Sequence, residues 1–168
     1  MELLIVRHAI AFARDRHRWR DDGARPLSPA GVRRARKAAA GLREFSKAPD
    51  RVLTSPLVRA RQTAEILTEV AGWPQAVEAS ELAPQASALA VLTLLGKDSV
   101  RRVALVGHQP NLGLLLTACL VGDGAALPID MKKNAVAALS FEGSPRAGCA
   151  ALRWLATPRM LRGFRHAR

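Results

Sequence analysis

Two histidines and two arginines carry the chemistry that this sequence suggests: His8, His108, Arg7 and Arg59. A neutral imidazole can attack phosphorus and form a covalent intermediate. A guanidinium group presents a planar fork of donors that fits phosphoryl oxygens. A second imidazole can donate a hydrogen bond as negative charge builds on the transferring group. Since phosphoryl transfer needs mainly positioning and charge stabilisation, these residues predict a phosphoryl-transfer site that requires no metal ion.

Each of these four residues follows a short apolar run. The three runs are residues 2–6, 51–55 and 101–107, and their length and composition predict buried strands. In open α/β sheets the ligand site lies beyond the carboxyl ends of the strands. Helices that begin there offer free N–H groups and a partial positive charge. The sequence therefore predicts that both imidazoles and both guanidinium groups converge where an anion is stabilised.

Helices alternate with the strands. Helical spacing of apolar residues and helix-start residues predict helices over 29–45, 56–71, 88–96 and 109–121. Two final strands are predicted over 135–141 and 149–156, a loop over 7–27, a linking segment over 73–85, and a loosely ordered chain from 159. The alternation predicts one domain over 1–168, a three-layer α/β/α fold with a mostly parallel central sheet.

Three sequence blocks carry a resemblance to a known family. They are LLIVRHAIA, SPLVRARQTAEIL and ALVGHQPNLG, and in this order they resemble the signature blocks of the histidine phosphatase superfamily. A fourth block, DDGARPLSPAG (21–31), resembles a segment of its small bacterial branch, the SixA-type phosphohistidine phosphatases. The resemblance covers roughly residues 2–120. It implies a phosphoglycerate mutase-like fold and phosphatase activity without a cofactor.

The resemblance also implies a role for each matched residue. His8 would accept the phosphoryl group as the nucleophile. Arg7 and Arg59 would hold phosphoryl oxygens, and His108 would be the second catalytic imidazole.

Three further residues, Asp22, Ser55 and Glu81, are candidates for contacting the substrate. Asp22 matches an acidic position ahead of the RPLS sequence, although Asp21 could equally fill that place. Ser55 is explained as a helix N-cap and could also face the site. One branch of the superfamily has an acidic residue directly after the second histidine, where this chain has Gln109. This departure leaves Glu81 as the candidate general acid.

The missing acid favours a phosphoramidate substrate. Imidazole leaves more readily than an alkoxide because its conjugate acid has a pKa of about 6.5. The linking segment 73–85 is also short, whereas the mutases and sugar phosphatases that the chain resembles carry a larger insertion covering the site. The sequence therefore predicts hydrolysis of phosphohistidine in a protein. A phosphatase of small phosphorylated metabolites, using the same four residues, is the alternative.

The charge balance is strongly basic, with 26 Lys and Arg against 14 Asp and Glu and a net charge of +12. Arginine concentrates in residues 14–43 and 146–168. Either the protein meets an anionic partner or it has a solvated arginine-rich surface. A catalytically inactive nucleic-acid-binding module is the alternative from another class. The aromatic content of 4%, with no aromatic residues interleaved in a basic stretch for base stacking, argues against it.

No motif calls for a metal ion or a membrane. The four histidines show neither H-x-x-H nor H-x-x-x-H spacing, and the two cysteines lie in no metal-binding motif. The apolar run at the N-terminus is too short to span a bilayer, and no signal peptide is recognisable. We therefore expect a cytoplasmic protein, and we expect it to be a monomer.

Overall fold

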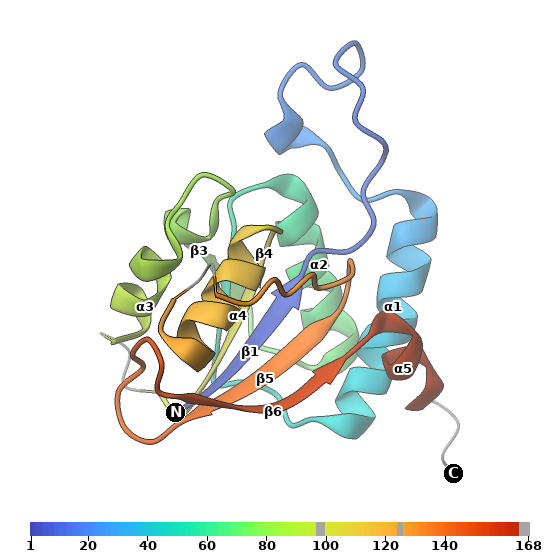
Figure 1. Cartoon of the computed structure of the whole chain (residues 1–168). Helices are drawn as coiled ribbons and strands as arrows, with labels where there is room; N and C mark the ends of the chain where they lie inside the picture. Colours follow the sequence, from blue (N-terminus) through green and yellow to red (C-terminus); the bar gives the residue numbers. More distant parts are fainter. Residues whose placement is uncertain (97–99, 124–125, 165–168) are drawn as a thin grey trace.

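The computed structural model describes residues 1–96, 100–123 and 126–164. Figure 1 shows its elements. In chain order they are β1 (Glu2–Arg7), η1 (Asp22–Ala24), α1 (Pro29–Phe45), β2 (Arg51–Thr54), α2 (Val58–Ala71), β3 (Ala76–Glu78), η2 (Ser80–Leu82), α3 (Ala88–Gly96), β4 (Arg102–Gly107), α4 (Asn111–Val121), β5 (Val136–Phe141), β6 (Ala150–Ala156) and α5 (Pro158–Gly163). Among the described residues, no helix is long and apolar enough to cross a membrane.

The strands form one six-stranded sheet in the order β3-β2-β4-β1-β5-β6. Neighbouring strands from β3 to β1 are parallel, whereas β5 and β6 are antiparallel additions. Arg7 pairs with Gly107 at the end of β1, and Thr54 pairs with Val106 at the end of β2. The carboxyl ends of β1, β2 and β4 therefore lie at one edge of the sheet, as the sequence predicts.

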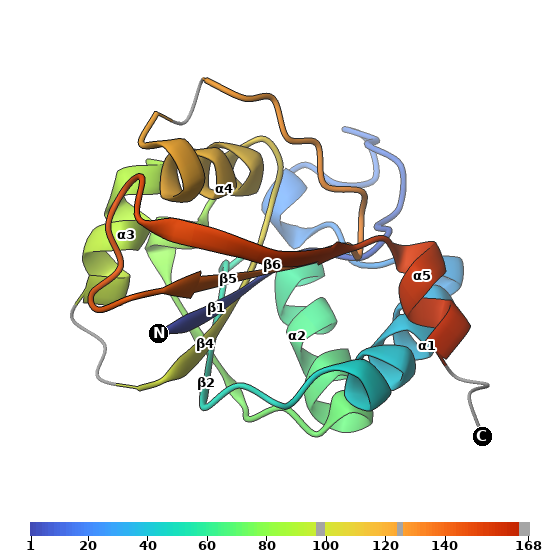
Figure 2. The same ribbon diagram turned by 60° about the horizontal axis from the view of Figure 1, so that its bottom comes forward.

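Helices cover both faces of this sheet, with α1, α2 and α5 on one side and α3 and α4 on the other (Figure 2). Successive residues of β1 point to opposite faces: Leu4 and Val6 join the core under α1 and α2, and Leu3 and Ile5 join the core under α3 and α4. Burial on both faces explains why the strand is a continuous apolar run rather than an alternating one.

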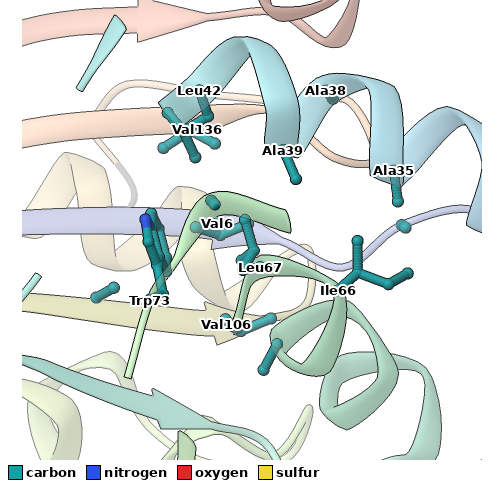
Figure 3. Close-up of a cluster of buried hydrophobic side chains, with 14 of the residues drawn as sticks. Val6, Ala35, Ala38, Ala39, Leu42, Ile66, Leu67, Trp73, Val106 and Val136 are labelled. Atoms are coloured by element: carbon teal, nitrogen blue, oxygen red, sulfur yellow. The ribbon is translucent and has the colours of Figure 1, made fainter. Parts of the chain in front are cut away.

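Small residues bring α1 close to the neighbouring helices α2 and α5. Figure 3 shows Ala35 and Ala39 of α1 on the side that faces Ile66 and Leu67 of α2, with Leu42 beside Val136 of β5. The helix begins where the sequence predicts, because the Ser28 side chain accepts a hydrogen bond from the Gly31 N–H and Pro29 occupies the first turn.

Predictions of local structure are wrong in three respects. Two helices begin two residues later than predicted. The second begins at Val58 rather than at Pro56, because the Ser55 side chain turns into the interior instead of capping the helix. The helix predicted over 109–121 begins at Asn111. The segment 73–85 contains the three-residue strand β3 and the turn η2. This edge strand is too short to show an apolar pattern.

The chain from 159 is also ordered as far as it is described, which is the third correction. Thr157 caps the Met160 N–H of α5, and Leu161 is buried under α1. At Gly41 of α1 the two helices touch so closely that a Cβ would overlap the Leu161 carbonyl. Residues 165–168 lie outside the described part of the chain.

Candidate active site

The carboxyl ends of β1, β2 and β4 open into a hollow of about 530 Å³. In Figure 1 the chain after β1 rises above this edge as a blue arm before it returns to α1. The basic and imidazole side chains that line the hollow are Arg7, His8, Arg14, Arg25, Arg59, His108 and Lys133. The rings of His8 and His108 are 4.9 Å apart between centroids. The fold thus brings together the four residues that the sequence singled out.

His8 is held in one orientation and in one tautomer. Its Nδ1–H donates to the Ala9 carbonyl at 2.6 Å, and its backbone N–H donates to the Gly107 carbonyl at 3.0 Å. Burial lowers the pKa of His8 to about 4, and the nearby Arg59, Arg7 and Lys133 add to this effect, against the hydrogen bond to Ala9. The imidazole is therefore neutral at pH 7, with its lone pair on Nε2.

His108 lies beside Ser55. Its Nε2 is 2.8 Å from Ser55 Oγ, which also accepts a hydrogen bond from the Leu57 N–H. Donation of the serine proton to Nε2 satisfies both groups and leaves the imidazole proton on Nδ1. Nδ1 is buried and has no partner in the described structure. Burial and then the neighbouring His8 lower the pKa of His108 to about 3, so a neutral ring presents one N–H donor.

Asp22 fixes Arg59. The Arg59 guanidinium donates to the Asp22 carbonyl at 2.7 Å and pairs with its carboxylate at 3.2 Å. Arg25 donates to the other carboxylate oxygen at 2.9 Å, and this bond is the main reason that the pKa of Asp22 is lowered. Arg59 is 4% exposed, and its Nε has no partner in the described structure. Arg14 lies 3.7 Å from the same carboxylate, so Asp22 pairs with three arginines while the buried Nε of Arg59 stays unused.

Arg7 is anchored by the segment that precedes β5. Its Nη1 donates to the Met131 carbonyl and pairs with Asp130 at 3.3 Å. Its buried Nε is a further donor without a partner in the described structure. Asn134 has a left-handed backbone conformation, with a φ of 69°. Its N–H donates to the Arg7 and His8 carbonyls and so holds this segment against the end of β1. The chain crosses there in orange in Figure 1.

The structure distinguishes the alternatives that the sequence leaves open. Asp22 contacts Arg59, whereas the Asp21 side chain accepts from the Gly23 N–H and caps a turn. Gln109 bonds the Gly113 N–H and the Ile129 carbonyl, so it joins α4 to the following segment. Glu81 is bonded to Ser80 Oγ at 3.2 Å and does not line the hollow. Its role as an acid stays a prediction.

Sequence reasoning missed Arg14, Arg25 and Lys133 as basic lining residues. Arg25 is buried and donates to the Phe12 carbonyl, which ties the arm to the site. It stands in the DDGARPLSPAG block, where the arginine was a usable signal. Lys133 has no local pattern that marks it, because the anchoring of its segment on β1 brings it there. Among the described residues, no group of three or more His, Cys, Asp or Glu side chains could hold a metal ion.

Comparison with known proteins fits this geometry. A model of the histidine phosphatase superfamily (branch 1) matches residues 3–83. Phosphohistidine phosphatase SixA of Escherichia coli is 29% identical over 162 residues, which cover 94% of each chain. The chain belongs to the histidine phosphatase superfamily. An uncharacterized protein of Picosynechococcus sp. is 41% identical over 116 residues, or 67% of this chain and 69% of that one.

The structural comparison agrees over nearly the whole chain. The structure of the protein histidine phosphatase SixA complexed with tungstate matches with a TM-score of 0.82 and 27% identity, covering 95% of this chain and 98% of that chain. The predicted phosphoglycerate mutase-like α/β fold is therefore confirmed. As a member of the histidine phosphatase superfamily with SixA-like neighbours, the protein is a phosphatase.

Proposed function

We propose that this histidine phosphatase removes the phosphoryl group from phosphohistidine in a protein, through a covalent intermediate on His8. The proposal rests on one observation: the neutral imidazole of His8 lies beside buried N–H donors that have no hydrogen-bond partner among the described residues. The Nδ1–H of His8 donates to the Ala9 carbonyl, so the lone pair of the neutral ring is on Nε2. The His8 side chain lines the hollow. A neutral imidazole with its tautomer fixed in this way can attack phosphorus without first losing a proton.

Three buried donor atoms support a phosphoryl site around that nucleophile. They are Arg7 Nε, Arg59 Nε and His108 Nδ1, and none has a partner in the described structure. A buried donor without a partner costs free energy, which a bound anion recovers. Donors fixed in advance stabilise charge in the transition state without reorganisation. These atoms are therefore the ones that we assign to the phosphoryl oxygens.

The reaction proceeds in two displacements. Nε2 of His8 forms a bond to phosphorus as the bond from phosphorus to the substrate imidazole nitrogen breaks, and that nitrogen keeps the electron pair. In the second step a water oxygen attacks the same phosphorus. The bond to Nε2 then breaks, and Nε2 keeps that electron pair. The substrate nitrogen took up one proton from solvent when it left in the first step. Of the two protons of the attacking water, one stays on the released hydrogen phosphate and the other returns to solvent, so the net reaction consumes one water molecule.

The hollow also supports a phosphoramidate as the substrate. No carboxylate is present among the described residues that line it, so no carboxylic acid there protonates an alkoxide leaving group. Imidazole needs less assistance, because its conjugate acid has a pKa of about 6.5. The names of the relatives point the same way: one is a phosphohistidine phosphatase, and the structure of another holds tungstate, a tetrahedral oxyanion.

The test is release of phosphate from a histidine-phosphorylated protein, with p-nitrophenyl phosphate in parallel. We expect kcat/KM to favour the phosphohistidine protein, and His8→Ala to lower both activities by at least about 10⁴-fold, as loss of a nucleophile does. His17→Ala, at an exposed position of the arm, is the matched control and should leave both unchanged. Turnover of the small ester alone would identify a metabolite phosphatase instead.

A further inference from the structure

A second pocket, of about 580 Å³, adjoins the hollow on the side of α1 and α5. Arg7 and Lys133 line both spaces. Five basic side chains line this second pocket besides Arg7, and we call them the basic cradle: Arg34, Lys132, Lys133, Arg159 and Arg162. The cradle is therefore continuous with the site of phosphoryl transfer.

The charge of the basic cradle is not compensated. None of its five cations has an ion-pair partner within 4 Å among the described residues. The one acidic residue that lines the pocket, Asp130, already pairs with Arg7. Cations gathered in a concave space without counter-charge raise the local concentration of anions. The pocket therefore favours an anionic ligand.

The fold holds these cations in place. Lys132 and Lys133 belong to the segment that Asn134 anchors on the carbonyls of Arg7 and His8. Arg159 and Arg162 belong to α5, which the capping by Thr157 and the burial of Leu161 fix against α1. Phe164, just after α5, stacks on Phe45 at 4.7 Å between ring centroids. The cradle is thus built on anchored backbone.

The kind of anion follows from how the cations are distributed. They come from α1, α5 and the segment before β5, and four of the five are exposed, with Arg162 half-buried. A single compact phosphate is better held by buried, fixed donors such as those of the hollow. Long exposed side chains spread over three elements suit several carboxylates on a polypeptide. An extended peptide advances about 3.5 Å per residue, so neighbours of a residue bound in the hollow reach the cradle.

We propose that the basic cradle binds acidic side chains that flank the phosphorylated histidine of the substrate protein. This inference rests on the proposed function, and it adds a determinant of substrate choice. The hollow contacts the phosphoryl group that every substrate shares. The cradle distinguishes one phosphorylated protein from another by the charge around the phosphohistidine.

The experiment compares two histidine-phosphorylated peptides, one with Glu and Asp at the flanking positions and one with Gln and Asn there. For the native enzyme we expect kcat/KM to favour the acidic peptide by about tenfold at low salt, as a few exposed ion pairs of modest strength would give. In the triple variant R34Q/R159Q/R162Q the preference should fall below twofold. All three side chains lie outside the hollow, so turnover of p-nitrophenyl phosphate should stay within twofold.

A matched variant, R33Q/K37Q/R153Q, removes the same charge from exposed positions that do not line the cradle. It should keep the tenfold preference, which separates the cradle from the net charge of the protein. An equal loss of preference in both variants would overturn the proposal. So would a preference that survives in R34Q/R159Q/R162Q.

Two further outcomes separate this inference from the proposed function. If the peptides are turned over well but without any preference for acidic flanks, the cradle proposal fails and the proposed function stands. If neither peptide is turned over better than p-nitrophenyl phosphate, both fail. A sugar bisphosphate favoured over its monophosphate, with the preference lost in R34Q/R159Q/R162Q, would also overturn the proposal and assign the cradle to a small substrate.

Discussion

The hollow and the basic cradle are adjoining sites, and both are rich in basic groups, yet they are built differently. In the hollow, Arg59 is buried and held by Asp22, and Arg7 is held by Asp130 and the Met131 carbonyl. In the cradle, cations such as Arg34 and Arg159 are exposed and have no ion-pair partner among the described residues. Arginine side chains are therefore mostly buried and paired in the hollow, whereas they are mostly exposed and without an ion-pair partner among the described residues in the cradle.

The difference separates catalysis from recognition. A buried, fixed guanidinium stabilises charge where it develops in the transition state, which raises kcat. An exposed cation acts through solvent, is screened by salt and contributes to binding or encounter. In our proposal, the paired groups of the hollow act in the reaction, and the unpaired groups of the cradle act in the choice of substrate.

We expect the largest difference in kcat between two variants that each replace one arginine by lysine, one in the hollow and one in the cradle. Arg59→Lys should lower kcat by about 10²-fold to 10³-fold, since lysine lacks the Nε donor and cannot make the paired contacts with Asp22. Arg159→Lys should change kcat by less than twofold, because the cradle needs only charge. Steady-state kinetics with p-nitrophenyl phosphate measures both, and equal losses would remove the distinction.

The pH dependence of the reaction tests the burial of His8, the proposed nucleophile. With a pKa of about 4, His8 stays unprotonated as the pH falls from 7 to 5, so kcat/KM for p-nitrophenyl phosphate should fall less than twofold. A histidine of ordinary pKa would lose about 30-fold at pH 5. A fall of that size, after correction for ionisation of the substrate, would mean that the hollow is as well solvated as the cradle.

Asp22→Asn should lower kcat by about 10-fold to 100-fold, the range seen when an outer partner of a site residue is removed. The amide keeps the shape but loses the charge that pairs with Arg59 and Arg25. Asp21→Asn is the control, because an amide oxygen still accepts from the Gly23 N–H. Equal behaviour of the two variants would show that Asp22 does not position Arg59.

Ser55→Ala should lower kcat about tenfold while leaving KM nearly unchanged. It removes the hydroxyl that fixes the tautomer of His108. Ser28→Ala removes a helix cap at α1 and should reduce the free energy of unfolding by about 1 kcal/mol without a comparable loss of kcat. Urea denaturation and kinetics on both variants separate positioning of the imidazole from stability.

The smallest effect concerns salt. Raising the salt from 0.05 M to 0.5 M should raise KM for an acidic phosphopeptide several-fold, because the Debye length shrinks from above to below about 10 Å. Turnover number with p-nitrophenyl phosphate should change little, since His8, Arg59 and His108 are buried and the Arg7 side chain is only 19% exposed. Measuring both substrates at the same salt concentrations provides the control, because a general effect of salt on the enzyme would change the kinetics with both.

Much of the site could be predicted because its residues follow local patterns. Strand 2–7 is an apolar run that ends in Arg7 and His8, and such a pattern depends only on neighbouring residues. The α5 helix shows how a local signal can be overlooked. Thr157 and Pro158 form the same kind of helix start as Ser28 and Pro29, but the arginines after them suggested a loose end.

The choice of Asp22 over Asp21 could not be made locally, because both precede the same turn. Only the approach of α2 places Arg59 against one of them, across 37 residues of chain. Ser55 was assigned to a helix cap for a similar reason: its partner His108 is 53 residues away. Lys133 reaches the hollow only through the anchoring of its segment on β1.

By itself, the sequence determined most of the strands and helices along the chain, though not β3 or α5, because periodicity and helix-start residues act over a few positions. It also placed two histidines and two arginines at strand ends. The tertiary structure decided which polar atoms find a partner and which do not. Arg59 pairs with Asp22, whereas Arg159 has no ion-pair partner in the described part of the chain, although both are arginines near a helix start. Pairing depends on residues that are distant in the chain, so only the folded arrangement separates the catalytic hollow from the basic cradle.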